Sequence, residues 1–592
     1  MKADQIIKNA KIFTADKDNP QAAALAVKDR KFVYVGDEAG LSDYEGEVTD
    51  LGGKFIMPGI FDTHCHVTVG ACFEFVDMGE YVPAESKQEA LEFMANYIKD
   101  NPGLDRYRFM MERAALGDED LTKWELDEIC PDTGLVVLEG ECHSVWVNSR
   151  LLEKHGITDD TPDPAPGLHY YVRDNDGHVT GNAYEATAWP FLFDGLQESL
   201  TDEQLEGALM RWVDFCREYG ESAVFDAGFP EHNEFQERFY GYLREMDRQG
   251  KLPVYVDGSY FLTDRHKVTE AIEETKRWNR EFNTEHMKVH TLKIFMDGTM
   301  KIHTAAMMEP YEGTDVAGMT MFNAEETADL IKKLNEAGMD LHVHTVGDRA
   351  SHVLLDGVEL ARKELGDDFR IKVTACHLES QYDTDLERFA ELGVIANYTP
   401  AWHTGYSDAD VKLSDLLGEK RAANMYRCKT VWDSGALVTW SSDDVAYYED
   451  FGTWNPYLGM EVGMTRWDNE KSLSPDFYKS SAPNPPESEK MSIEEMILGY
   501  TINGAKQLGV EDIKGSIEAG KDADFLVFDE DLLTAEHEGF SYQKPTDVYI
   551  EGKKINEGRS DYKKCEDIHI RPEQSYRICA RCGRWQICLC RR

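Results

Sequence analysis

The chain has 592 residues, with 111 acidic side chains against 63 basic ones, so its formal net charge is −48 at pH 7. Its 42% hydrophobic content allows large buried cores and excludes a disordered chain, a collagen-like repeat and a disulfide-stapled miniprotein. A polyanion of this size is repelled by phosphate groups, so we expect neither nucleic acid nor an anionic membrane as a partner.

Nothing in the sequence predicts export or membrane insertion. The first residues, MKADQIIKNAKIF, mix charged and apolar side chains and do not resemble a secretory signal. No 18 apolar residues run together, so no membrane span is expected. Cysteines before residue 560 lack pairing spacings and are expected to be reduced thiols that pack as small hydrophobes. We therefore predict a cytoplasmic protein.

Strand patterns occur at both ends of the chain. Residues 5–13 and 23–36 alternate apolar and polar side chains, which is typical of half-buried strands. Residues 523–531 and 546–556 have the same character, the second with a turn at Glu551-Gly552. The pattern predicts one small β-sandwich domain built from residues 1–57 and 514–558.

Between these ends, β-rich runs alternate with amphipathic helical stretches, which predicts parallel strands with crossover helices. The eight runs are 56–66, 222–228, 253–261, 291–298, 339–348, 371–380, 393–402 and 436–444. Most intervals between them are close to the roughly 31 residues per unit of an eight-stranded barrel. The predicted fold class is therefore α/β, with a TIM-like (β/α)8 barrel built from residues 58–66 and 215–513.

Three segments fall outside this repeat. The interval after the first strand is about 130 residues longer than one unit, so residues 67–214 are predicted to be a large insertion after strand 1 that roofs the site. Residues 445–490 are expected to form a lid or substrate loop. The tail, 559–592, holds five cysteines, four of which have spacings that can bind zinc, but its abrupt change of composition favours a disordered or non-native extension.

Residues that bind metals fall at the carboxyl ends of the predicted strands. His64 and His66 end the first strand, and residues i and i+2 of a strand point to the same side. Barrel enzymes place their chemistry at this face. Histidine and carboxylate ligands suit zinc or a similar divalent ion with an open coordination position. The further candidates at this level are Lys293, His344, His377 and Asp443.

Lys293 is the unusual member, because an ammonium group beside a cation is repelled. The side chain must be neutral, turned away, or converted by CO2 into a carbamate that bridges two metals. The alternative is a lysine paired with Asp297 or another acid.

Eight segments carry a family resemblance that spans about residues 5 to 557. They are MPGIFDTHCH, CHSVWVNS, TGNAYEA, LKIFMDGT, HTVGDRA, SSDD, YTINGA and GSIEAGKDADFLV. With these segments the chain resembles the amidohydrolase superfamily, and specifically the amidohydrolase 3 family, which includes N-substituted formamide deformylases.

The resemblance implies a metal-dependent hydrolase with two divalent ions, for which zinc is expected. By position, His64 and His66 would bind the more buried ion with Asp443, and His344 and His377 the second. Lys293, as a CO2-derived carbamate, would bridge them. The family favours His344 over His342, which strand parity does not separate. Asp443 would also be the catalytic acid and base for a metal-activated hydroxide.

Two departures from the family pattern bear on the substrate. Strand eight has SSDDVA where the family usually has GSDAPV, so Asp444 adds a second carboxylate, and His303 stands where relatives usually carry an arginine. The candidates for substrate contact also include side chains of the insertion and two tryptophans. They are His143, Glu185, His303, Trp402 and Trp454.

The predicted function is hydrolysis of the C–N bond of a small amide, N-acyl or formamide-type substrate. One alternative is a deaminase of the same superfamily, although HTVGD offers no glutamate beside the strand-five histidine. Another is a non-catalytic binding or scaffold paralogue on the same fold, against which the intact ligand types argue. We expect a small-molecule substrate, and a homodimer is compatible with the sequence.

Overall fold

The computed structural model describes residues 1–555 except 74, 77, 117–118, 141–142, 197–199, 231–232, 405–411, 445–451 and 474–481. The predicted lid, 445–490, lies partly outside the described residues, and the tail, 559–592, lies wholly outside them.

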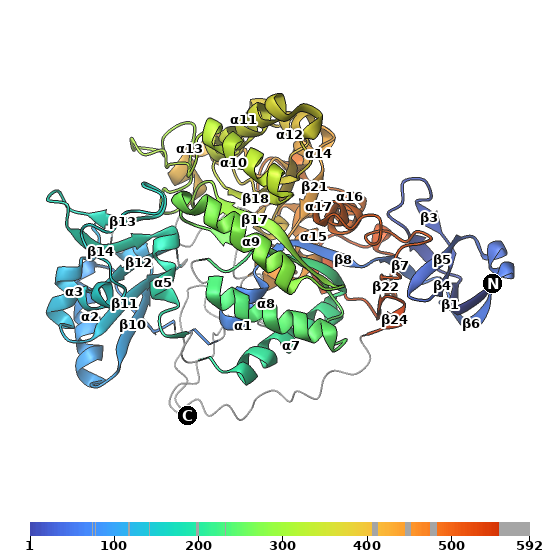
Figure 1. The fold of residues 1–592 in the computed structure, drawn as a ribbon, viewed down its shortest axis with the longest axis horizontal. Helices are drawn as coiled ribbons and strands as arrows, with labels where there is room; N and C mark the ends of the chain where they lie inside the picture. Colours follow the sequence, from blue (N-terminus) through green and yellow to red (C-terminus); the bar gives the residue numbers. More distant parts are fainter. Residues whose placement is uncertain are drawn as a thin grey trace.

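An eight-stranded parallel sheet forms the centre of the molecule and confirms the predicted barrel (Figure 1). Its strands are β8 (Ile60–Cys65), β15 (Glu221–Asp226), β16 (Tyr255–Leu262), β17 (Met287–Phe295), β18 (Asp340–Thr345), β19 (Val373–His377), β20 (Ile395–Tyr398) and β21 (Val438–Trp440). Each strand pairs with the next in parallel. All eight predicted strands are present, with ends that differ by a few residues.

Hydrogen bonds between the first and last strands nearly close the barrel. The Thr63 hydroxyl donates to the carbonyl of Trp440 at 2.8 Å, and the backbone N–H of Asp443 donates to the carbonyl of His64 at 2.8 Å. These bonds bring the HxH segment and the predicted carboxylate to the same rim.

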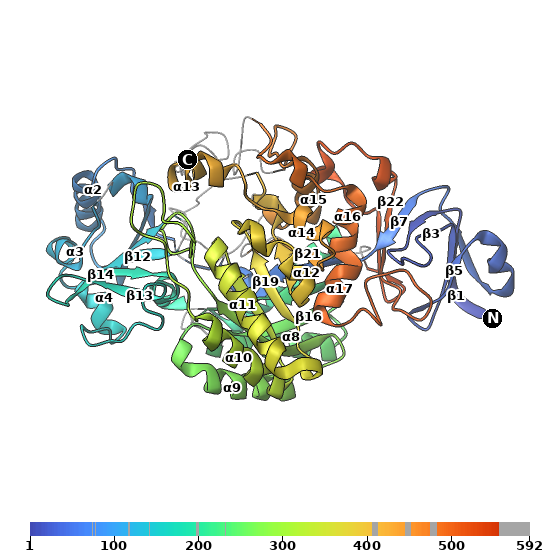
Figure 2. The ribbon, with the colours of Figure 1, turned by 90° about the horizontal axis from the view of Figure 1, so that it is seen from above.

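Helices cover the outside of the barrel (Figure 2). They include α7 (Asp202–Tyr219), α8 (Asn233–Arg248), α9 (Val268–Phe282), α10 (Ala324–Ala337), α11 (Asp348–Leu365), α12 (Arg388–Leu392), α13 (Leu413–Ala422), α14 (Cys428–Asp433), α15 (Pro456–Thr465), α16 (Ile493–Leu498) and α17 (Gly504–Leu508).

The sequence of α10 shows why these helices begin and end where they do. Asn323 caps its first turn in a capping box with Glu326, which satisfies two backbone donors. Gly338 ends it with φ 67°, a left-handed conformation that glycine adopts without a Cβ clash. Leu330, Ile331 and Leu334 face inward, and burying each leucine-sized side chain contributes about 2 kcal/mol.

The two chain termini together build a β domain of two sheets, as predicted. The first has the order β5-β4-β1-β6 and the second the order β24-β23-β22-β7-β2-β3. A core that includes Ile7, Phe32, Ile56 and Phe525 joins them. Their strands are β1 (Lys2–Lys8), β2 (Lys11–Phe13), β3 (Gln21–Ala22), β4 (Ala24–Lys28), β5 (Lys31–Gly36), β6 (Glu45–Asp50), β7 (Phe55–Pro58), β22 (Phe525–Phe528), β23 (Asp547–Ile550) and β24 (Lys553–Lys554).

The insertion after β8 has its own six-stranded sheet, in the order β13-β14-β12-β11-β10-β9. Figures 1 and 2 show it at the opposite end of the barrel from the terminal β domain. Its elements include α1 (Val67–Phe73), β9 (Glu80–Tyr81), α2 (Lys87–Asp100), β10 (Arg106–Met111), α3 (Lys123–Ile129), β11 (Gly134–Glu139), β12 (Ser144–Val147), α4 (Ser149–Lys154), β13 (Tyr170–Arg173), β14 (Val179–Tyr184) and α5 (Trp189–Leu192). Across the described residues, none of the helices has the length and apolar character that a membrane crossing needs.

Candidate metal centre

The two histidines of β8 meet the predicted carboxylate at the barrel mouth. His64 Nε2 lies 2.9 Å from Asp443 Oδ1, and His66 Nε2 lies 3.4 Å from the same oxygen. His66 Nδ1 lies 2.8 Å from the carbonyl of Gly228, so Nδ1 is the protonated nitrogen and Nε2 offers its lone pair. The three side chains can therefore contribute ligands to one ion.

Lys293 lies in the same cluster. Its Nζ is 3.3 Å from His64 Nε2 and 3.5 Å from Cys376 Sγ. Burial lowers the pKa of Lys293, which favours the neutral amine that reacts with CO2. Within the part of the chain that the structure describes, Lys293 forms no ion pair with a carboxylate.

Asp297, the rival partner of Lys293, is engaged elsewhere. It accepts hydrogen bonds from the backbone N–H groups of Ala306, Val346 and Gly347 at 2.8, 2.9 and 2.8 Å. Its side chain therefore fixes the loops that follow β17 and β18, and the predicted alternative of a Lys293–Asp297 pair is not formed.

The histidines of β18 and β19 lie beside this cluster. The His377 ring is 4.9 Å from that of His64 and 4.5 Å from that of His344, measured between centroids. His377 Nδ1 is buried without a hydrogen-bond partner, at 3.7 Å from Asp443 Oδ2. His344 stacks on Phe295, and its Nε2 lies 3.2 Å from the carbonyl of Gly298. His344 is thus near His377, but one of its nitrogens faces a carbonyl.

Backbone conformation turns two of these side chains inward. His377 has φ 74° and Asp443 has φ 51°, a region that non-glycine residues rarely occupy. Each such residue costs on the order of 1 kcal/mol or more and persists where the surrounding structure holds it. The strain lies directly at the candidate ligands.

Burial sets the protonation of the cluster. It lowers the pKa of His64 and His377 well below the usual range, so both rings are neutral and have lone pairs to donate. Burial alone would raise the pKa of Asp443, but contacts with the surrounding basic side chains, among them the hydrogen bond from His66, lower it to about 2. His64 and His377 therefore present neutral imidazoles and Asp443 an ionised carboxylate, which are the forms that bind metals.

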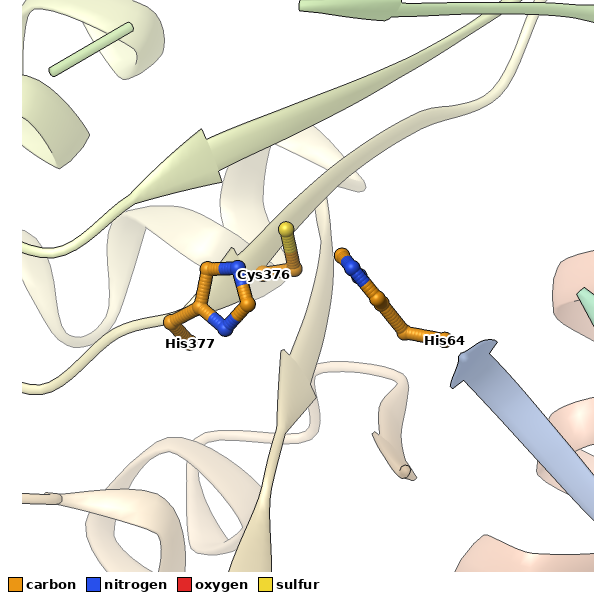
Figure 3. Close-up of side chains that lie close together, drawn as sticks. All are labelled: His64, Cys376 and His377. Carbon is orange, nitrogen blue, oxygen red and sulfur yellow. The ribbon is translucent and has the colours of Figure 1, made fainter. Parts of the chain in front are cut away.

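Two residues of the cluster were not predicted from the sequence. His342 Nε2 lies 2.8 Å from His64 Nδ1, so it orients the His64 ring; strand parity alone placed it with His344. Cys376 was expected to be a packing thiol, yet Figure 3 shows it between His64 and His377. The ligand atoms of these three residues lie within 4.8 Å of one another.

The predicted contacts from the insertion form a network with the barrel. His143 Nδ1 lies 2.7 Å from Glu185 Oε2, and Glu185 is fully buried with φ 55°. Glu185 Oε1 accepts the backbone N–H of Thr299 at 3.2 Å and the hydroxyl of Thr304 at 2.5 Å. His143 and Glu185 thus join the insertion to the loop after β17, which contains Thr299 and Thr304.

The remaining substrate candidates differ in position. Trp402 is half-buried and stacks on His377, with centroids 5.5 Å apart and planes at 13°. His303 has φ 60° and packs on Tyr311 in the loop after β17. Trp454 is buried in a hydrophobic core and stacks on Phe215. Trp402 therefore lies at the metal cluster, whereas Trp454 contributes to packing.

The donor set fits divalent ions. Imidazole and carboxylate ligands in one buried cluster suit zinc and other borderline metals. The unpartnered Nδ1 of His377 is the kind of buried polar atom that a bound ion would satisfy.

Comparisons with known proteins identify relatives over nearly the whole chain. The model of the amidohydrolase family, type 3, matches residues 47–555. N-substituted formamide deformylase of Arthrobacter pascens is 26% identical over 547 residues, covering 89% of this chain and 94% of that protein. The exoenzymes regulatory protein AepA of Pectobacterium carotovorum subsp. carotovorum is 26% identical over 423 residues, covering 69% and 88%. An uncharacterized metal-dependent hydrolase from Pyrococcus furiosus superposes with a TM-score of 0.59 at 21% identity, covering 90% of this chain and 100% of that one.

Proposed function

The chain belongs to the amidohydrolase 3 family, and from this membership we propose that it is a metal-dependent hydrolase of a small amide, N-acyl or formamide-type substrate. The observation that best supports this function is that side chains from the carboxyl ends of five barrel strands lie together at one rim of the barrel. They are His64, His66, Lys293, His344, His377 and Asp443. The similarity to a protein named for formamide deformylation supports the substrate class.

We propose two divalent ions, with zinc as the metal and a carbamate on Lys293 between them. His64, His66 and Asp443 would hold one ion, and His344 and His377 the other. Bound ions supply a Lewis acid for the scissile carbonyl and lower the pKa of water at the site. The carbamate accounts for a buried lysine amine that has no carboxylate partner in the described part of the chain.

Asp443 is the proposed proton carrier. Its low pKa keeps it ionised, so it can accept a proton from water and then deliver it to the departing nitrogen. Its backbone N–H is fixed by the carbonyl of His64 at 2.8 Å, which keeps the carboxylate at the rim during the transfer. An amide needs this delivery, since an amine leaves far more readily once protonated.

Two sets of contacts would shield a substrate from solvent. Trp402 offers an aromatic face beside His377, and the His143–Glu185 pair closes the insertion against the loop after β17. These contacts would exclude bulk water around the scissile bond, which strengthens the electrostatic interactions there.

The decisive experiment combines metal analysis with product assay. Purified protein should contain close to two zinc ions per chain beyond any bound by the tail cysteines, and metal-replete protein should release carboxylic acid from a panel of N-formyl, N-acetyl and longer N-acyl amines. Ammonia released from a heteroaromatic amine would indicate a deaminase instead. Protein without metal and without turnover would indicate a binding paralogue.

Two adjacent carboxylates provide a matched pair of variants. Asp443→Asn should lower kcat by about 100-fold or more, because it removes the proton carrier. Asp444→Asn should retain most activity, since the Asp444 carboxylate accepts a hydrogen bond from Thr453, whereas the Asp443 carboxylate contacts the histidine rings. Equal losses in both variants would contradict the role of Asp443.

A further inference from the structure

We propose that Cys376 is a metal ligand, so that the centre contains a thiolate as well as imidazoles and carboxylate. The inference rests on the proposed metal-dependent function and extends it, because the six candidate ligands above include no sulfur. It concerns the ion nearest to His377, whether or not Lys293 carries a carbamate.

The position of the thiol carries the argument. Cys376 lies at the end of β19, one residue before His377, and its side chain is fully buried inside the barrel. A regular strand points consecutive side chains to opposite sides. Here the left-handed backbone of His377 breaks that alternation, so both residues face the cluster. Figure 3 shows the thiol between the rings of His377 and His64.

The distances match a metal site after small movements. The Cys376 sulfur and a ring nitrogen of His377 lie within 4.8 Å of each other, while His64, which also lies within that distance, would stay with the first ion. A tetrahedral zinc ion with Zn–N of about 2.1 Å and Zn–S of about 2.3 Å separates its ligands by about 3.4 to 3.8 Å. Side-chain shifts of about 1 Å would close that difference, which is within the range of rotamer adjustment.

A second observation points independently to a ligand at this place. His377 is 3% exposed and its Nδ1 has no hydrogen-bond partner, although buried ring nitrogens are nearly always satisfied. The Cys376 thiol donates a hydrogen bond to the carbonyl of Val343 at 3.1 Å and accepts one from Lys293 Nζ at 3.5 Å, so coordination would replace the first of these with a bond to the metal. An ion between the thiol and His377 would satisfy the unpartnered ring nitrogen.

Charge and chemistry agree with this arrangement. Among the described residues, Asp443 is the one carboxylate within 4.0 Å of the ring nitrogens of His64, His66 and His377, so two divalent ions would bring an excess of positive charge into a buried site. Coordination replaces the S–H bond of Cys376 with an S–metal bond and releases one proton to solvent, which adds one negative charge to the cluster. Thiolate ligands also favour zinc, cobalt and cadmium over magnesium and manganese.

The test is optical and does not depend on turnover. In a full-length background with the five tail cysteines replaced by serine, apo-protein would be loaded with Co²⁺. We expect visible ligand-field bands together with a near-ultraviolet thiolate-to-cobalt charge-transfer band. Cys376→Ser should keep visible bands, lose the charge-transfer band and bind cobalt at least about 10-fold more weakly. Cys216→Ser is the matched control, since that buried thiol contacts Glu221 outside the cluster and should leave the band intact.

A second measurement keeps Cys376 in place, so its result does not depend on whether Cys376→Ser folds. Zinc-edge X-ray absorption of the same background should detect a sulfur scatterer at about 2.3 Å. Cobalt bound with no charge-transfer band, or zinc with only nitrogen and oxygen neighbours, would overturn the Cys376 assignment and leave the proposed hydrolase intact. Failure to bind either metal would overturn both.

Discussion

The contact between the terminal β domain and the barrel should depend on the charge of His286. This residue precedes β17 and lies between two carboxylates, with Nδ1 at 2.6 Å from Asp247 Oδ1 and Nε2 at 2.9 Å from Glu551 Oε1. Both ring nitrogens can donate only in the imidazolium form. Asp247 belongs to α8 of the barrel, whereas Glu551 is in the turn between β23 and β24, so a protonated His286 joins the two domains.

The magnitude follows from the pKa of His286. The hydrogen bond to Glu551, opposed by burial and supported by Asp247, raises this pKa from 6.5 to about 9. That rise corresponds to about 3 kcal/mol, which we reduce to about 2 kcal/mol because the ring is partly open to solvent. Since the pKa is raised on folding, the stabilisation is fully present below pH 6.5 and is lost as the pH rises through about 9.

The assay compares His286→Gln with the parent chain by urea denaturation across that pH range. We expect the variant to lose about 2 kcal/mol of unfolding free energy below pH 6.5 and to match the parent above pH 9. His178→Gln is the control, because His178 forms a similar pair with Asp159 at 2.8 Å but is 55% exposed, and its loss should be small. A deficit in His286→Gln that does not change with pH would refute the reasoning.

Two further predictions concern the surroundings of the metal cluster. Gly298→Ala should lower the free energy of unfolding by about 1 to 3 kcal/mol in urea titrations, because the added Cβ would collide with the Glu185 carboxylate. The control is Gly241→Ala, which has open space around it within helix α8 and should keep or slightly raise the free energy of unfolding. His342→Gln should weaken zinc binding by about 10 to 100-fold in competition with a chromophoric chelator, since it disturbs the partner of His64 Nδ1; an unchanged Kd would contradict that role.

Much of the fold was predictable because it depends on patterns that local sequence carries. Parallel strands buried on both faces give the apolar runs that located all eight barrel strands, and the turn at Glu551-Gly552 follows from a glycine that tolerates a positive φ of 72°. The pairing of His64 with His66 follows from strand parity. These features can be predicted from the periodicity of apolar and polar residues along the sequence.

The metal cluster was only partly predictable because tertiary contacts decide its details. Strand parity excludes Cys376 and His377 from facing the same side, and only the left-handed backbone at His377 brings both inward. Parity likewise treats His342 and His344 alike, whereas their depth in the barrel separates an orienting contact with His64 from a position beside His377. Spacing places His342 deeper than His344, but it does not reveal which ring contacts His64, and it does not encode backbone strain.

The seam between β8 and β21 has a consequence for biosynthesis. Thr63 and Trp440, which bond across it, are 377 residues apart in sequence. A ribosome releases the HxH segment long before the strand that completes the ring, so the emerging polypeptide must keep its first barrel strand from aggregating until synthesis is nearly finished. The proposed metal site can therefore form only after the last barrel strand has been synthesised. A chain that ends before Val438 would lack both the closing strand and Asp443.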